Sequence, residues 1–167
     1  MIAGTAGLSI GAGAAAPALV LDTNVVLHWL LFRDARCAAL AEAIAAGRVR
    51  WIASAALRAE LQHVLARGIR GDWTVNAESI LHSWDRWATM VEATDAAAPP
   101  SMRCTDKDDQ KFIDLALQVR ASALLSNDRA VLKLARRAGV HGLKILTVEA
   151  WQRQTPGPAA GSPPSRG

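Results

Sequence analysis

The chain has 167 residues, of which 51% are hydrophobic and 20% are charged. This balance supports a buried core and excludes an intrinsically disordered protein. The formal net charge of +4 suits a polyanionic partner better than a polycationic one, although many soluble proteins without such a partner carry a similar excess. No run of 18 or more apolar residues occurs, so no membrane-spanning helix is expected.

Two segments differ in composition from the rest of the chain. Residues 1–17 are rich in Gly and Ala and have no Lys or Arg, unlike a secretory signal. Residues 155–167 are rich in Pro and Gly. We expect both to be disordered tails on one folded domain, residues 18–154. The chain has only two cysteines, too few for a disulfide framework, and this agrees with a reducing, cytoplasmic location.

Short apolar runs alternate with stretches of helical periodicity along the folded part. Strands are expected at residues 18–21, 49–53, 89–92, 123–125 and 143–146. Helices are expected at residues 24–32, 35–46, 54–67, 77–87, 105–120, 129–138 and 148–152. The alternation predicts a three-layer α/β/α fold around a parallel sheet of four to five strands. Right-handed crossovers then bring the carboxyl ends of the strands to one edge.

Acidic residues follow two of the expected strands. Asp22 ends the first strand and Asp128 follows the fourth, so both are expected at the same edge of the sheet, where open α/β sheets bind ligands. Helical phase places Asp109 on the apolar side of its helix, whereas Asp114 points away and is expected in solvent. A simpler alternative is that Asp22 or Thr23 only caps the following helix.

Glu60 borders an apolar stripe, and the pattern alone favours a surface side chain with a buried stem over a site residue. Several carboxylates in one pocket repel one another, and a hard divalent cation relieves that repulsion. Oxygen donors of this kind suit Mg²⁺ or Mn²⁺. The four histidines are scattered and form no pattern of zinc ligands. An acidic, metal-binding pocket in a basic chain favours phosphodiester hydrolysis.

Four stretches resemble the PIN-domain ribonucleases, and within that family the VapC-like toxins. They are LVLDTNVV (residues 19–26), LRAELQHVLAR (57–67), TDKDDQKFIDLA (105–116) and LLSNDRAVL (124–132). They occur in the family's order and span nearly the whole folded part. The sequence departs from the family at Asp106 and Asp108, which crowd Asp109. It also departs at Asn127, where the family often has a small residue, and in the Gly/Ala-rich leader.

The resemblance implies an acidic quartet of Asp22, Glu60, Asp109 and Asp128. Three of these, the aspartates, would hold Mg²⁺ or Mn²⁺, and Glu60 would bind the ion directly or through a neighbour. Two polar residues, Asn24 and Ser126, match positions that support the first and last acids. Four basic residues near the same edge are candidates for holding an RNA backbone: Arg58, Arg67, Arg129 and Lys133.

By the same resemblance, the protein is a Mg/Mn-dependent endoribonuclease that cleaves single-stranded RNA. It would be the toxin of a toxin–antitoxin pair, with a cognate antitoxin as partner and a homodimeric state. Two alternatives stay open. One is a non-catalytic RNA-binding or regulatory module. The other is a phosphatase with Asp22 as nucleophile, although Asn24 breaks the DxDxT pattern of that class. Residues 73–87 are a further candidate, as a Trp-rich partner surface or as part of the core.

Overall fold

The structure is a computed structural model that describes residues 15–69 and 76–155. Its helices and strands run from Ala18 to Gln154. The two predicted tails, residues 1–17 and 155–167, lie almost wholly outside the described residues. So do residues 70–75, between the helices expected at residues 54–67 and 77–87.

A parallel five-stranded sheet forms the centre of the domain, in the order β3-β2-β1-β4-β5. Each adjacent pair is parallel. In the middle of the sheet, Leu21 of β1 lies opposite Leu125 of β4, so the next residues, Asp22 and Ser126, leave the sheet side by side. The strands are β1 (Ala18–Leu21), β2 (Arg50–Ala53), β3 (Ala88–Met90), β4 (Ala123–Leu125) and β5 (Lys144–Leu146).

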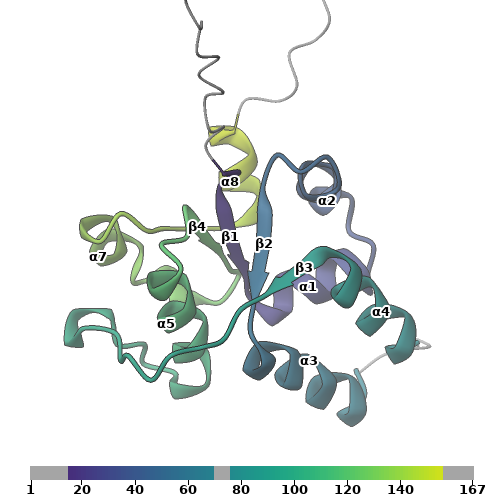
Figure 1. The fold of residues 1–167 in the computed structure, drawn as a ribbon, viewed down its shortest axis with the longest axis horizontal. Helices are drawn as coiled ribbons and strands as arrows, with labels where there is room; N and C mark the ends of the chain where they lie inside the picture. Colours follow the sequence, from purple (N-terminus) through teal and green to yellow (C-terminus); the bar gives the residue numbers. More distant parts are fainter. Residues whose placement is uncertain (1–14, 70–75, 156–167) are drawn as a thin grey trace, which may run out of the picture.

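Helices cover the sheet on both sides. In Figure 1, α1 to α4 lie to the right of β1 and β2, and α5 and α7 lie to their left, while the arrows of β1 and β2 point downward. This arrangement confirms the predicted three-layer α/β/α fold. The helices are α1 (Thr23–Leu30), α2 (Ala38–Ala45), α3 (Ala55–Arg67), α4 (Ala77–Trp87), α5 (Gln110–Gln118), α6 (Arg129–Leu132), α7 (Ala135–Val140) and α8 (Val148–Gln154).

Tryptophans form part of the core between the sheet and its helices. Trp51 on β2 and Trp84 on α4 pack edge to face, with ring centroids 4.6 Å apart, and the ring centroid of Trp29 lies 5.6 Å from that of Trp51. Because the side chain of Trp84 is only 1% exposed, it belongs to the core and not to a partner surface. Trp73 lies outside the described residues.

Three details differ from the expected elements. The expected helix at residues 105–120 begins later, at Gln110: Asp106 caps a preceding 3₁₀ turn, η3 (Lys107–Asp109), by accepting a hydrogen bond from the Asp108 backbone N–H at 2.9 Å. The predicted helix at residues 129–138 is two short helices, α6 and α7. The second of them continues through Gly139 to Val140, and the positive φ of 74°, a conformation that glycine adopts readily, falls at Gly142.

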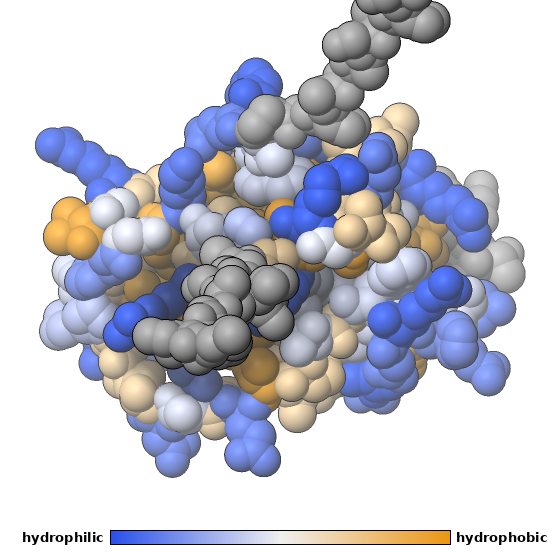
Figure 2. All heavy atoms as spheres, turned by 45° about the horizontal axis from the view of Figure 1, so that its top comes forward, coloured by the Kyte–Doolittle hydropathy of each residue, from blue (hydrophilic) through white to orange (hydrophobic). Residues whose placement is uncertain are grey.

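The surface is largely polar. Figure 2 shows many hydrophilic side chains on one face of the molecule, with hydrophobic residues in separate patches, one of them at the left edge. Among residues 15–69 and 76–155, the large hydrophobic side chains that are exposed belong to Met90 and Val140. None of the helices in these two ranges has the length and apolar character needed to cross a membrane.

Candidate functional site

Asp22 lies at the carboxyl end of the central strand and is only 3% exposed. Its backbone N–H donates to the Leu125 carbonyl at 2.9 Å, which extends the pairing of β1 with β4 by one residue. Its Oδ1 accepts from the Asn24 backbone N–H at 3.3 Å, so Asp22 does cap α1. Capping engages one carboxylate oxygen and leaves the other free for a different partner. The cap and the site are therefore compatible.

Ser126 joins the two acids that follow the central strands. Its hydroxyl donates to Asp22 Oδ2 at 2.6 Å and accepts from the Asp128 backbone N–H at 3.0 Å. Asp128 in turn caps α6, with Oδ1 accepting from the Ala130 backbone N–H at 2.7 Å. Because Ser126 is completely buried, this bridge fixes the relative position of the two carboxylates.

Asp109 reaches the same acidic cluster from the start of α5. Its Oδ2 is buried and has no hydrogen-bond partner. The pKa of Asp109 is raised to about 7, first by burial and then by the negative charges of Asp22, Asp128, Asp106 and Glu60, in that order. Burial also raises the pKa of Asp22, with smaller contributions from Asp128 and Glu60. The four predicted acids thus lie near enough to act on one another.

The two acids close to Asp109 in the sequence, Asp106 and Asp108, differ from it in burial. Asp106 and Asp108 are exposed, whereas Asp109 is half-buried. Asp106 is engaged in capping the turn before Asp109. Of the three adjacent acids, only Asp109 has a buried carboxylate oxygen without a partner, and this agrees with the choice made from helical phase.

Glu60 belongs to the cluster through contacts that the sequence pattern did not predict. Its Oε1 accepts from the Thr23 hydroxyl at 3.2 Å, which ties α3 to the start of α1. Its Oε2 forms an ion pair with Lys111 Nζ on α5. Thr23 and Lys111 were therefore missed by sequence reasoning. Thr23 adjoins Asp22 in the first motif, but Lys111 lies off the apolar stripe of its helix and gave no signal.

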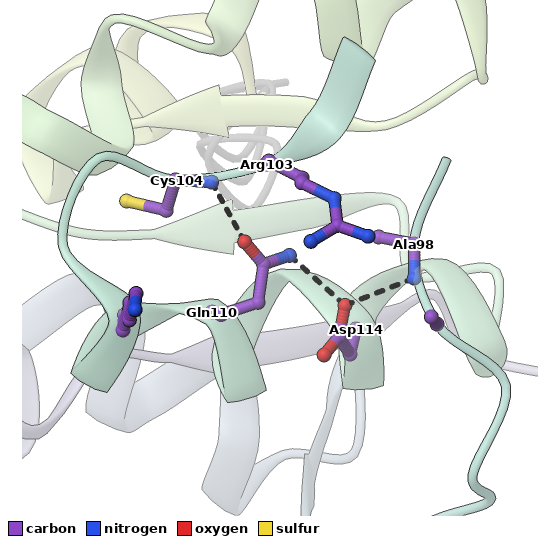
Figure 3. Close-up of a pocket in the computed structure, with 7 residues that line it drawn as sticks. Ala98, Arg103, Cys104, Gln110 and Asp114 are labelled. Atoms are coloured by element: carbon purple, nitrogen blue, oxygen red, sulfur yellow. Dashed lines mark hydrogen bonds between the residues drawn. The ribbon is translucent and has the colours of Figure 1, made fainter. Parts of the chain in front are cut away.

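Asp114 is not in solvent, contrary to the prediction from helical phase. Its Oδ1 accepts from the Ala98 backbone N–H at 3.3 Å and from Gln110 Nε2 at 3.0 Å. Figure 3 shows both contacts at the wall of a pocket between α5 and the segment that precedes it. That segment, residues 97–104, covers the helix face that the phase argument assigned to solvent.

Gln110, the residue that follows Asp109 in the chain, fastens this segment to α5 (Figure 3). Its Oε1 accepts from the Cys104 backbone N–H at 2.6 Å, and its Nε2 donates to the Met102 carbonyl at 3.2 Å. The first turn of α5 is therefore held in place by side-chain hydrogen bonds to a loop, and this holds Asp109 against the edge of the sheet.

We expect Gln110→Ala to lower the free energy of unfolding by about 1–3 kcal/mol, because it leaves the Cys104 N–H and the Met102 carbonyl without partners. Urea denaturation measures this loss. The matched control is Gln62→Ala, which truncates an exposed glutamine of α3 and should change stability by less than about 0.5 kcal/mol. Equal effects of the two variants would contradict this role for Gln110.

The structure also places the polar residue and the basic residues that were expected to support the site. Asn24 is exposed and contributes its backbone N–H to Asp22. Arg58 forms two hydrogen bonds of 2.8 Å with Asp85, so its guanidinium is already engaged with a carboxylate. The other three basic residues considered for RNA binding, Arg67, Arg129 and Lys133, are exposed.

The donor atoms of the cluster suit a hard divalent cation. They are carboxylate oxygens, and the unpartnered Oδ2 of Asp109 is a buried acceptor of the kind that a cation satisfies. Within residues 15–69 and 76–155, no three Asp, Glu, His or Cys side chains are already grouped as ligands of one ion. The residue types therefore fit Mg²⁺ or Mn²⁺, but a cation would have to draw the carboxylates together.

The fold and the site define an α/β/α domain with an acidic cluster at the carboxyl edge of a parallel sheet. Residues 18–130, more than half of the chain, match the PIN domain family. The chain belongs to the PIN domain family, which confirms the family predicted from the sequence motifs.

Solved structures agree with this assignment at the level of the fold. One similar chain comes from the crystal structure of VapBC2 from Rickettsia felis bound to a DNA fragment from their promoter. The TM-score is 0.54 at 12% sequence identity, over 77% of this chain and 96% of that chain. At this identity the likeness shows a shared fold. No curated protein matches the sequence.

Proposed function

We propose that this PIN domain is a Mg²⁺- or Mn²⁺-dependent endoribonuclease that cleaves single-stranded RNA. The observation that carries the proposal is the gathering of Asp22, Glu60, Asp109 and Asp128 from four separate segments. Burial and mutual repulsion raise the pKa values of two of them, Asp22 and Asp109. Such a cluster is destabilising by itself, and a bound cation compensates for its cost.

In this proposal, Asp22, Asp109 and Asp128 hold the ion, and Glu60 stands beside them on α3. A bound divalent cation supplies an activated water molecule and neutralises the charge that develops on the phosphate. The protein contributes the positions of the carboxylates. Ser126 keeps Asp22 and Asp128 at a fixed separation, and Gln110 holds the turn that carries Asp109. The buried location of Asp22 limits the access of bulk water to its carboxylate.

The proposal includes a toxin–antitoxin setting. The similar fold comes from VapBC2, which is bound to its promoter DNA, and a cognate antitoxin and a homodimer are the corresponding partners for this chain. A cytoplasmic location belongs to the same proposal, because Cys37 and Cys104 are both buried and unpaired, as in proteins of reducing compartments.

The test is cleavage of end-labelled single-stranded RNA by the full chain with Mg²⁺, with Mn²⁺ and with EDTA. We expect cleavage with either cation and none with EDTA. Binding of intact RNA under all three conditions would instead identify a non-catalytic RNA-binding module. Finding an antitoxin-like reading frame beside the gene, and inhibition of cleavage by its product, tests the toxin assignment separately.

A further inference from the structure

Lys111 is a cation inside the acidic cluster. Its Nζ pairs with Glu60 Oε2 and lies 5.6 Å from the centroid of the Phe112 ring. The other ion pairs of the described residues involve acids outside the cluster, so only the pair with Glu60 joins a basic side chain to one of the four acids. Lys111 therefore has a position that the exposed arginines near this edge do not share.

The ion pair holds the ammonium without enclosing it. Both oxygens of Glu60 are engaged, one with Thr23 and the other with Lys111, so the carboxylate is fixed from two sides. The side chain of Lys111 nevertheless remains 32% exposed. An ammonium has three N–H donors, and the contact with Glu60 uses only part of that capacity.

A phosphodiester that approaches this edge meets four acids. A cation within the cluster lowers that repulsion, and a lysine ammonium is a compact point charge that binds phosphate oxygens. Arg58 is engaged with Asp85 and does not supply this charge. Among the described residues, Lys111 is thus the basic residue that an ion pair with one of the four acids holds beside the cluster.

We propose that Lys111 binds a phosphate of the RNA strand at the acidic cluster, and that Glu60 orients its ammonium for this contact. The inference rests on the proposed nuclease function and names a residue that holds its substrate. Glu60 is then a positioning residue that acts through Lys111. The three aspartates remain the group that binds the cation.

The test measures binding of a fluorescein-labelled single-stranded RNA of about ten nucleotides by anisotropy, over a range of salt concentrations. Ca²⁺ replaces Mg²⁺, and a gel verifies that the RNA stays intact. Loss of one phosphate contact lowers the slope of log K against log salt by about 0.7 for a single strand. We expect this change for Lys111→Met, with roughly tenfold weaker binding, the effect of losing one charge-assisted hydrogen bond. Lys111→Arg should keep most of the affinity.

Two comparisons separate phosphate binding from a purely structural role. Lys144→Met removes a lysine from β5 that contacts Gln154, away from the acids, and should leave the salt slope unchanged. Glu60→Gln removes the ion pair but keeps an oxygen for Thr23. If Lys111 only neutralised Glu60, adding Lys111→Met to Glu60→Gln would have no effect on RNA binding. We expect Lys111→Met to lower the slope in that background too, but by less than in the wild type, because Glu60 no longer orients the ammonium.

If Lys111→Met alone does not fold, the double variant can still be measured, because it removes both partners of the ion pair and leaves no unpaired charge. An unchanged salt slope in the double variant would overturn the role of Lys111. The wild-type cleavage assay distinguishes this result from a failure of the proposed function. Wild-type cleavage with an unchanged slope refutes only the lysine contact, whereas absence of wild-type cleavage refutes the nuclease.

Discussion

Replacing Asp22 with Asn is expected to reduce metal-dependent RNA cleavage by more than about a hundredfold. Partners that only orient a metal ligand are worth about 10–100-fold, so loss of the charge on a proposed ligand should cost more. The fold should survive, because Asn keeps an oxygen that accepts from Ser126 and burial already disfavours the charged form of Asp22. Initial rates on end-labelled RNA measure the effect, with circular dichroism as the check on folding.

Two further variants make this result specific. Ser126→Ala removes the hydroxyl that bridges Asp22 and the Asp128 backbone N–H, and should lower cleavage by about 10–100-fold. Asp95→Asn changes an exposed carboxylate in the loop after β3 and should leave the rate unchanged. Full activity in a homogeneous Asp22→Asn preparation would refute the proposed active site.

Without metal, the stability of the wild-type protein should fall as the pH rises from about 4 to about 7. The pKa of Asp109 is raised from 3.8 to about 7 in the folded protein, first by burial and then by the neighbouring acids. Between these values the folded state keeps a proton that the unfolded chain has released, so raising the pH favours unfolding. Thermal denaturation in EDTA across this range measures the slope.

Asp109→Asn should remove much of that slope and raise the Tm of the metal-free protein near pH 7.5. Each kcal/mol of relief corresponds to about 2–4 °C for a domain of this size, so we expect a rise of several degrees. Mg²⁺ should stabilise the wild type increasingly as the pH rises, because the cation competes with the proton, and should stabilise the variant much less. Asp108→Asn, at an exposed neighbouring position, is the matched control. A Tm of Asp109→Asn that follows wild type at every pH would contradict this account.

The sequence by itself determined the alternation of strands and helices and the positions of Asp22 and Asp128. Both acids directly follow apolar runs, and parallel strands necessarily end at one edge. It also determined which acid at the start of α5 points inward. The apolar residues that follow Asp109 show which side of this helix faces the core, and Asp109 lies on that side. These are local properties of the chain.

Only the tertiary structure decided the environments of Glu60, Lys111 and Asp114. The partner of Glu60 depends on how α3 packs against α5, and no periodicity within either helix encodes that contact. Asp114 points away from the core as its phase requires, yet the segment at residues 97–104 folds over it and supplies the Ala98 N–H. Helical phase gives the direction in which a side chain leaves its own helix. Whether that side chain then meets solvent or another segment depends on how other parts of the chain fold.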